Sequence, residues 1–548
     1  MSFQMADIFE AMADAIPDRE CFVCGDQRYS YAEFERRANQ LAHALEARGV
    51  GRGDHVGTYM YNSAEYVTTM IACFKLGAVP ININYRYVEE ELRYLFDNAD
   101  LKAVVHHREF APRIAAVKHE CPALETLVHV EDGSGADVEA IGSVEFGAAL
   151  AEGSPERVFE PRSGDDLFII YTGGTTGMPK GVMWRHEDIF FAGMAGGDPQ
   201  GGNPVKSVEE LVERAKNAPM QLTMMAAPPL IHGAAQLATF IAFNAGNKLV
   251  MQPRFDAEDV VRLLAEENVN SLSIVGDAMA RPIAEALERN AGTGRHEIKM
   301  LFAIGSAGAI FSEPVKARLK AQLPNTMLLD SYGSTETGYQ GQGSGAETKS
   351  FGQGLSFQMN ERTVVLDDDH QIVKPGSGVR GRVALKGHVP MGYYNDPKKT
   401  AETFVTLGGE RYSITGDIAE VMEDGTVKLY GRGSVCINSG GEKIFIEEVE
   451  NALVSHPAVK DAVVVGVDDE KWGQRVVALV SIEDSASDPG EKAVQEHART
   501  LVAGYKVPKE VYVVDEVFRG PNGKADYKGS KKLASELSAA RAQAGAQA

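Results

Sequence analysis

The sequence predicts an α/β protein with a large amino-terminal unit and a small carboxy-terminal unit. Strand-like and helix-like hydrophobic patterns alternate over the first 110 residues, which favours a largely parallel sheet covered by helices. A chain of 548 residues is too long for one hydrophobic core, so about two to four folding units are expected. A new series of short strands and helices begins after Tyr430 and indicates that the last unit starts there.

Local signals predict the amino-terminal elements in order. Ser30 and Glu33 form a capping-box pattern ahead of apolar residues at helical spacing that continue to Leu45, and Gly49 can end this helix. The other elements expected here are strands over 56–60, 79–83 and 103–105 and helices over 63–76 and 88–96.

Later segments carry weaker patterns. Residues 194–219 combine a loop rich in Gly, Pro and Asn with a charged helix, and we expect them at the surface, above a binding site. Residues 339–360 are rich in Gly and polar residues and predict a mobile loop. In the last unit we expect strands over 462–467, 476–482 and 511–514 and a helix within 491–502. From Ser535 the tail predicts disorder or a frayed helix.

The composition argues against several kinds of partner and location. The formal net charge of −22 opposes binding to polyanions, so no nucleic acid is expected. No apolar run approaches the roughly 20 residues that span a bilayer, and the first ten residues lack the pattern of a signal peptide. Five cysteines, an odd and sparse number, favour a reducing cytoplasm. Cys21 and Cys24 lack a second ligand pair, so we interpret them as structural.

A glycine-rich loop is the first segment that indicates chemistry. The apolar strand 167–171 runs into TGGTTGMPKG, where glycines let the backbone wrap around phosphate oxygens and Lys180 adds a positive charge. The phosphate-binding residues predicted here are Thr172, Gly173, Gly174, Thr175, Thr176, Gly177 and Lys180. Pro179 before the lysine and Gly181 after it exclude the Walker A pattern, so a P-loop kinase fits poorly. The plainer alternative is an ordinary Gly/Thr hairpin.

Six motifs in order carry a resemblance to a known family. After the loop come PPLIHG (228–233), SYGSTETG (331–338), YSITGD (412–417), GRGSVCINSGGEKIFIEEVE (431–450) and PNGK (521–524). The chain resembles the adenylate-forming superfamily of acyl-CoA synthetases, luciferase and peptide-synthetase adenylation domains, with Gly173 in place of the family's serine. The resemblance implies a large multi-subdomain α/β domain (1–431), a small mobile α+β domain (432–548), and an ATP-dependent, AMP-forming acid–thiol ligase.

Each motif also makes physical sense at a site for ATP. Glu336 on a Gly-flanked turn suits Mg²⁺, which prefers carboxylate and phosphate oxygens, and the plainer interpretation is a surface glutamate. Tyr332 can offer its aromatic face to a purine, and the plainer interpretation is a tyrosine of the hydrophobic core. Asp417 suits a ribose hydroxyl or caps a turn, and Arg432 reaches the same ribose or forms an interdomain salt bridge. Lys524 can stabilise the negative charge that develops at the α-phosphate, and the plainer interpretation is a solvated surface lysine.

The resemblance extends these assignments to a full set of site residues. The catalytic residues implied are Lys524, Thr335, Glu336 and Lys180, with Thr175 and Glu336 toward Mg²⁺. The ATP and AMP contacts implied add Ser306, Gly308, Asp330, Ser331, Tyr332, Asp417 and Arg432 to the loop. The coenzyme A channel implied comprises Ser439, Gly440, Gly441 and Lys443. The acyl-pocket candidates are Trp184, His232, Ala235, Gln236, Phe240 and Gly305, and ordinary core packing is the alternative for about half of them.

The acid itself is predicted from a narrower resemblance. YTGGTTGMPKGVMWRHEDI (171–189), GYYNDPKKTAETF (392–404) and the unusual hinge Ser434-Val435 resemble ligases that activate steroid side-chain carboxylates. A medium- or long-chain fatty acid is the alternative substrate, because a hydrophobic pocket discriminates weakly. An adenylating enzyme that does not use coenzyme A and a non-catalytic acyl- or nucleotide-binding protein are the other classes. The oligomeric state is open, with a homodimer among the options.

Overall fold

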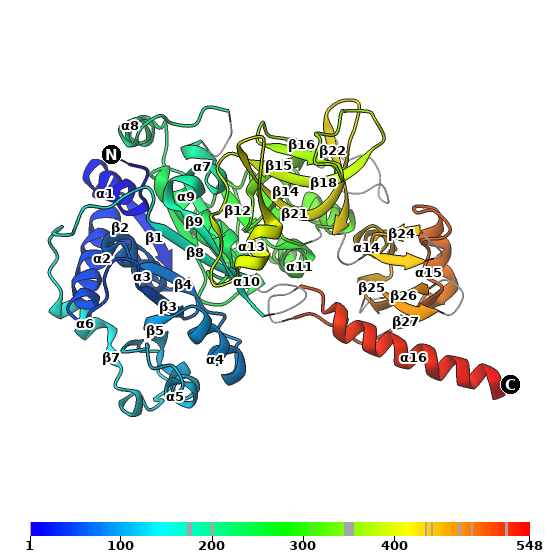
Figure 1. Cartoon of the computed structure of the whole chain (residues 1–548), viewed down its shortest axis with the longest axis horizontal. Coiled ribbons are helices and arrows are strands. Elements are labelled where there is room, and N and C mark those ends of the chain that lie inside the picture. Colours follow the sequence, from blue (N-terminus) through cyan, green and yellow to red (C-terminus); the bar gives the residue numbers. More distant parts are fainter. Residues whose placement is uncertain are drawn as a thin grey trace.

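The structure is a computed structural model that describes residues 2–172, 178–198, 202–309, 311–344, 356–432, 436–439, 442–469, 473–483, 486–520 and 524–547. Figure 1 shows a large unit, coloured from blue to yellow and ending with β22 (Thr426–Arg432), beside a small unit in orange and red that begins with β23 (Ile437–Ser439). The predicted α/β class is confirmed. None of the described helices combines the length and apolar character needed to cross a membrane.

A parallel sheet forms part of the large unit near the amino terminus. Across the sheet, its strands are β4 (Val79–Asn82), β3 (His55–Tyr59), β5 (Leu101–His107), β6 (Thr126–Val130) and β7 (Val144–Glu145). The helices of this region are α2 (Tyr31–Glu46), α3 (Ala64–Leu76), α4 (Glu89–Asn98), α5 (Ala111–Lys118) and α6 (Phe146–Glu152). The predicted capping box of Ser30 and Glu33 is confirmed at the start of α2. Gly77 ends α3 in the left-handed conformation, which glycine adopts without steric cost.

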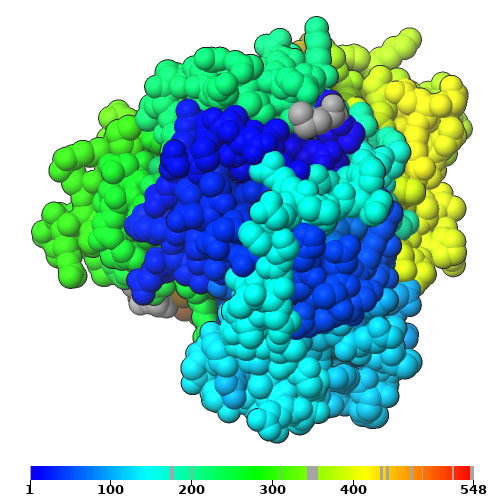
Figure 2. Space-filling model, turned by 90° about the vertical axis from the view of Figure 1, so that its left-hand side faces the viewer, coloured from blue at the N-terminus to red at the C-terminus, as the bar shows by residue number. Residues whose placement is uncertain are grey.

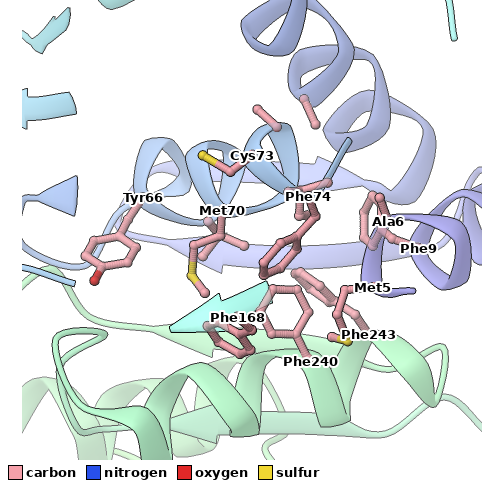
Figure 3. Close-up of a cluster of buried hydrophobic side chains, with 14 of the residues drawn as sticks. Met5, Ala6, Phe9, Tyr66, Met70, Cys73, Phe74, Phe168, Phe240 and Phe243 are labelled. Carbon is pink, nitrogen blue, oxygen red and sulfur yellow. The ribbon is translucent and has the colours of Figure 1, made fainter. Parts of the chain in front are cut away.

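An aromatic core anchors the first strand of the glycine-rich hairpin. Figure 3 shows side chains of α1 (Met5–Ala15), α3 and α9 (Gly233–Asn244) meeting around β8 (Leu167–Thr172). Phe74 lies with its ring centroid 5.4 Å from that of Phe168 and 5.5 Å from that of Phe240, and all three are almost fully buried. Each such ring contributes roughly 1.5–3 kcal/mol by burial, so β8 has a rigid support.

An extended strap, residues 153–166, crosses α1 and α2 on the face shown in Figure 2, where cyan chain lies over blue. Arg157 pairs with Glu35 at 2.6 Å and Arg162 with Glu10 at 2.6 Å. Lys75, which is fully buried, lies between the same two carboxylates at 2.6 and 2.8 Å. The network ties the strap, α1, α2 and α3 together.

A long mixed sheet runs through the large unit. Its order is β17 (Thr363–Leu366), β18 (Arg380–Lys386), β21 (Glu410–Val421), β22, β16 (Ser356–Met359), β15 (Gly338–Ser344), β14 (Met327–Ser334), β13 (Ala303–Ala307), β12 (Ser271–Ile274), β10 (Thr223–Ala226), β11 (Lys248–Met251), β1 (Glu20–Cys24) and β2 (Gln27–Ser30), with β20 (Phe404–Leu407) beside β21. The sheet is parallel from β1 to β14 and antiparallel from β14 onward. Helices α10 (Ala257–Glu266), α11 (Gly276–Thr293) and α12 (Glu313–Gln322) belong to the parallel half.

A smaller antiparallel sheet joins β8 to β9 (Lys180–Arg185) and β19 (Gly392–Tyr393). After β9 come α7 (His186–Gly193), a short turn of helix at Ala195–Gly197 and α8 (Val208–Asn217). The charged helix predicted within 194–219 is therefore confirmed. Helix α13 (Pro397–Thr403) follows β19.

The prediction of a loop over 339–360 is wrong at both ends of the segment. Its described residues form β15 and β16, which pair with each other at Gly341 and Met359. A Cβ on Gly341 would lie 2.4 Å from the carbonyl oxygen of Gln358, so glycine here permits close strand approach. The glycine content was therefore a sign of packing in these strands.

The small unit has its own sheet and core. Its further elements are β24 (Glu442–Ile444), α14 (Ile446–Val454), β25 (Val459–Asp469), β26 (Gly473–Ile482), α15 (Gly490–Arg499), β27 (Glu510–Val513) and α16 (Tyr527–Gln547). From Ser535 the sequence predicted disorder or a frayed helix, whereas in the structure α16 continues to Gln547. Buried Ser538 hydrogen-bonds Glu510, and Arg541 pairs with Glu491 at 2.8 Å, so tertiary contacts hold this part of the helix.

Candidate active site

The glycine-rich loop is anchored at its base. Thr172 and Lys180 face each other in the β8–β9 pairing. The side chain of Asn82 donates to the carbonyl of Tyr171 at 2.8 Å and accepts from its N–H at 2.8 Å. The loop itself lies outside the described residues, which removes Gly173, Gly174, Thr175, Thr176 and Gly177 from the geometry.

Lys180 holds an exposed ion pair at the foot of this loop. Its ammonium pairs with Asp396, the residue that caps α13, and lies 5.7 Å from the ring centroid of Tyr393. The hydrogen bond from Lys180 lowers the pKa of the Asp396 carboxyl, so the carboxylate is ionised at neutral pH. An exposed pair of this kind contributes little stability, so Lys180 is able to exchange Asp396 for a phosphate oxygen.

Glu336 is positioned from several elements at once. The Tyr393 hydroxyl donates to its carboxylate at 3.0 Å, and the Ser413 hydroxyl donates to its backbone carbonyl at 2.7 Å. The neighbouring Thr335 carbonyl accepts from the Trp184 indole N–H at 2.9 Å. Strands β9, β19 and β21 therefore fix the turn after β14, and Tyr393, which holds the Glu336 carboxylate, also lies 5.7 Å from the Lys180 ammonium.

Tyr332 and Asp417 form the second half of the site. The Tyr332 hydroxyl donates to the Asp417 carboxylate at 2.7 Å, and Thr415 donates to the same oxygen at 3.0 Å. One face of Tyr332 packs on Phe357 at 4.6 Å between centroids. Asp417 pairs in register with Arg432, so the family's two ribose contacts are brought together by the backbone. An aromatic ring beside a fixed carboxylate suits a nucleoside.

The 228–233 segment meets the Glu336 turn. A Cβ on Gly233 would lie 3.6 Å from the Thr335 hydroxyl. Burial, and after it the positive charges of Lys524 and Arg86, together lower the pKa of His232 to about 4. Lys524 of the small unit thus reaches His232 of the large unit electrostatically. The backbone N–H of Gly520 donates a hydrogen bond of 2.7 Å to the carbonyl of Lys524.

At the carboxyl ends of β13 and β14, two predicted ATP contacts use their side chains within the protein. The Ser306 hydroxyl accepts from the Gly276 N–H at 2.9 Å, and Asp330 pairs with Lys316 at 2.6 Å. Burial raises the pKa of Asp330, while Lys316 opposes the shift. Ser331 follows Asp330 in β14. A Cβ on Gly305 or Gly308 would meet nothing within 4 Å, so both glycines border open space.

The predicted acyl-pocket residues divide into two groups. Gly305 borders open space and His232 lies near Lys524, whereas Trp184, Ala235 and Gln236 are buried. Phe240 packs in the aromatic core of Figure 3, which agrees with the core alternative given for these residues.

Most of the predicted coenzyme A segment lacks described side chains. Ser439 lies in β23 and pairs with Gly473 of β26. Gly440 and Gly441, like the hinge residues Ser434 and Val435, lie outside the described residues, and Lys443 is described only by its backbone in β24.

Sequence reasoning missed the residues that support the site. Tyr393, Asp396 and Ser413 contact predicted residues, and Asn82 contacts Tyr171, the residue before the predicted Thr172, yet none of the four was among the candidates. The available signal was Asp396 before Pro397, a helix-start pattern next to two tyrosines.

Comparisons with known proteins show the family of the chain. The model of the AMP-binding enzyme family matches residues 9–394, and that of the AMP-binding enzyme C-terminal domain matches residues 448–524. A medium/long-chain-fatty-acid–CoA/3-oxocholest-4-en-26-oate–CoA ligase of Mycobacterium tuberculosis is 48% identical over 97% of this chain and 96% of its own. A 3-oxocholest-4-en-26-oate–CoA ligase of Rhodococcus rhodochrous is 47% identical over 97% and 96%. The medium-chain acyl-CoA ligase Mig of Mycobacterium avium is 40% identical over 97% and 98%.

Solved structures share the fold over nearly the whole chain. The anthranilate CoA ligase AuaEII in complex with anthranoyl-AMP gives a TM-score of 0.80 at 22% identity, covering 98% of each chain. ATP-bound MatB from Rhodopseudomonas palustris gives 0.79 at 24% identity, covering 97% of this chain and 99% of its own. The chain therefore belongs to the AMP-binding enzyme family and is an acyl-CoA synthetase.

Proposed function

We propose that this enzyme activates a steroid side-chain carboxylate, first as acyl-AMP and then as the coenzyme A thioester. The observation that carries the proposal is the 47–48% identity, over nearly the whole chain, to ligases named for 3-oxocholest-4-en-26-oate. The charge of Lys524 in the small unit also acts on His232 in the large unit. Two lysines, Lys180 and Lys524, therefore border a site that also contains Glu336 and the Tyr332–Asp417 pair. That arrangement suits transfer of a carboxylate to the α-phosphate of ATP.

The chemistry requires charge stabilisation more than a nucleophile on the protein. A carboxylate is a poor electrophile, and joining it to AMP with loss of pyrophosphate creates a good leaving group. Negative charge grows on the phosphate oxygens during this step, and positioned ammonium groups stabilise it. We assign Lys524 to the α-phosphate and Lys180 to the outgoing phosphates. Tyr332 and Asp417 would hold the adenosine.

The donor set at Glu336 fits Mg²⁺. Tyr393 holds one carboxylate oxygen of Glu336, and among the described residues no hydrogen bond occupies the other oxygen, which would be available to a cation. No cluster of three or more His, Cys, Asp or Glu side chains suited to a metal occurs within the described ranges. Glu336, with Thr175 of the loop, would hold the ion, and bound Mg²⁺ would neutralise phosphate charge.

The thioester step assigns a second role to the small unit. We propose a boundary between residues 431 and 432 and a rotation about it, after which the 439–443 segment lines a channel for pantetheine. The separate sheet and hydrophobic core of the small unit support such a movement. The thiol of coenzyme A, with an ordinary pKa near ~8.5, then attacks the acyl-AMP carbonyl.

The acid is the narrower part of the proposal. Relatives that are 47–48% identical carry the 3-oxocholest-4-en-26-oate name, and the open space at Gly305 and Gly308 suits a bulky acid. The same names include medium- and long-chain fatty acids, so a linear acid is the second candidate. Cys21, Cys24, Cys73 and Cys121 are buried free thiols, which supports a cytoplasmic location, and a homodimer stays a prediction.

The test is acid-dependent release of AMP and pyrophosphate by purified protein with MgATP, with and without coenzyme A. The acids would be short, medium and long fatty acids, cholesterol-derived C26 and C24 acids, and bile acids. Preference for the steroid acids supports the proposal. Preference for linear acids would show that the substrate is a fatty acid and would leave the proposed reaction unchanged. No pyrophosphate with any acid would point to a binding protein.

A further inference from the structure

One arginine of α11 bridges the two units. Arg281 is 8% exposed, and its guanidinium forms an ion pair with Glu483 and donates to the Lys460 carbonyl at 2.9 Å. Helix α11 belongs to the large unit, whereas Lys460 lies at the start of β25 and Glu483 directly follows β26. Figure 1 shows α11 on the side of the large unit that faces these strands.

The contact point is connected to the turn that carries Lys524. Asp461, next to Lys460, accepts two hydrogen bonds from the Arg519 guanidinium, at 2.7 and 2.8 Å. Arg519 in turn pairs through its backbone with Ala525, the residue that follows Lys524. Few covalent and hydrogen-bonded steps therefore separate Arg281 from Lys524. A bidentate arginine–carboxylate pair fixes orientation as well as distance.

At this contact Arg281 is a positive charge between a carboxylate of the large unit and one of the small unit. Asp277 of the large unit lies 3.7 Å from the Arg281 guanidinium and accepts from the Ser312 hydroxyl at 2.5 Å. Burial raises the pKa of Asp277, Asp461 of the small unit raises it further, and Arg281 opposes both effects. Without the arginine, Asp277 would face Asp461 and Glu483 across the contact, and like charges would favour separation.

We propose that Arg281 is a positioning residue that holds the small unit where Lys524 reaches His232, and that it serves acyl-AMP formation but not the thioester step. The claim about the two half-reactions rests on the proposed function. The structural part, the contact of Arg281 with Glu483 and Lys460 and the effect of the Lys524 charge on His232, is independent of the reaction.

The kinetic test compares Arg281→Ala with Arg289→Ala. Arg289 lies on the same helix in an exposed pair with Glu258 at 2.6 Å, within the large unit. Arg281→Ala should slow single-turnover pyrophosphate release about tenfold, since contacting residues couple by roughly 0.5–3 kcal/mol. Thioester formation from supplied acyl-AMP and coenzyme A should be unchanged or faster. Arg281→Lys should retain part of the first rate, and Arg289→Ala should match wild type.

The structural test needs no turnover. The pKa of His232, followed by hydrogen–deuterium exchange of its ring C–H with mass spectrometry, should be higher in Arg281→Ala than in wild type, because Lys524 moves away. Lys524→Met should produce a rise of the same sign. An unchanged His232 pKa in Arg281→Ala, or equal loss of both half-reactions, overturns the proposal. If the pKa of His232 rises in Arg281→Ala but the protein releases no pyrophosphate with any acid, the positioning role of Arg281 stands and the proposed function is rejected.

Discussion

Tyr393→Phe tests whether a single hydroxyl orients the Glu336 carboxylate. Tyr393 is 7% exposed, donates to Glu336 at 3.0 Å, and packs its ring 5.4 Å from that of Phe404. Phenylalanine keeps the ring contacts, including the face beneath Lys180 at 5.7 Å, and removes the donor. The substitution therefore isolates the orientation of Glu336 from packing.

The size of the effect follows from the charge on the acceptor. A hydrogen bond to an ionised group contributes about 1.5–3 kcal/mol, more than a neutral one. If Glu336 binds its cation only in the orientation that Tyr393 holds, kcat/KM for MgATP should fall about tenfold to 150-fold. The loss should shrink as Mg²⁺ concentration rises, because excess cation compensates for a less ordered carboxylate.

The assay is acid-dependent exchange of pyrophosphate into ATP, measured against Mg²⁺ concentration. Tyr512→Phe is the matched control, because its hydroxyl donates to Glu510 at 2.6 Å in the small unit. The control should leave exchange within about twofold of wild type. A Tyr393→Phe enzyme with wild-type exchange, or one that loses no more than the control, would refute the reasoning.

Three other perturbations have expected outcomes. Lys524→Ala should nearly abolish acyl-AMP formation yet keep thioester formation from supplied acyl-AMP; equal loss in both assays would contradict its assignment. Burial lowers the pKa of His186 from 6.5 to about 4, so the unfolded chain takes up the proton first and stability is lost as pH falls from about 6.5 to about 4. The full loss is about 3 kcal/mol, and His186→Asn should weaken the acid dependence of denaturant midpoints. Lys75→Met leaves Glu10 and Glu35 without their shared cation and should destabilise the fold by about 3–5 kcal/mol in thermal unfolding, whereas a change below about 1 kcal/mol would contradict that network.

Local rules predicted much of the amino-terminal fold because the relevant interactions are short-range. The capping box at Ser30 and the helix stop at Gly77 depend on hydrogen bonds within a few residues. The prediction of a loop over 339–360 failed because the glycine at position 341 is required by tertiary packing. The neighbouring strand passes too close to Gly341 for a side chain to fit. Likewise, no local pattern foretells that Arg541 on the tail pairs with Glu491.

The site divides in the same way. Glu336, Lys180 and Asp417 stand in segments whose residue types suit phosphates and nucleosides, so sequence motifs identified them. Tyr393 supports Glu336 from 57 positions away along the chain, and Asp396 reaches Lys180 across 216 positions. Contacts over such separations are set by how β19 and β9 pair, which depends on the whole sheet rather than on neighbouring residues.

Asn82 has a consequence for engineering. Its amide donates to the Tyr171 carbonyl at 2.8 Å and to the Ile231 carbonyl at 2.7 Å, so one side chain ties the strand before the glycine-rich loop to the segment that carries His232. A chimera that imports residues 228–233 from a relative to accept a new acid must therefore present a carbonyl at that spot. A graft with a different loop path would loosen β8 as well and would lose ATP affinity along with the intended change in selectivity.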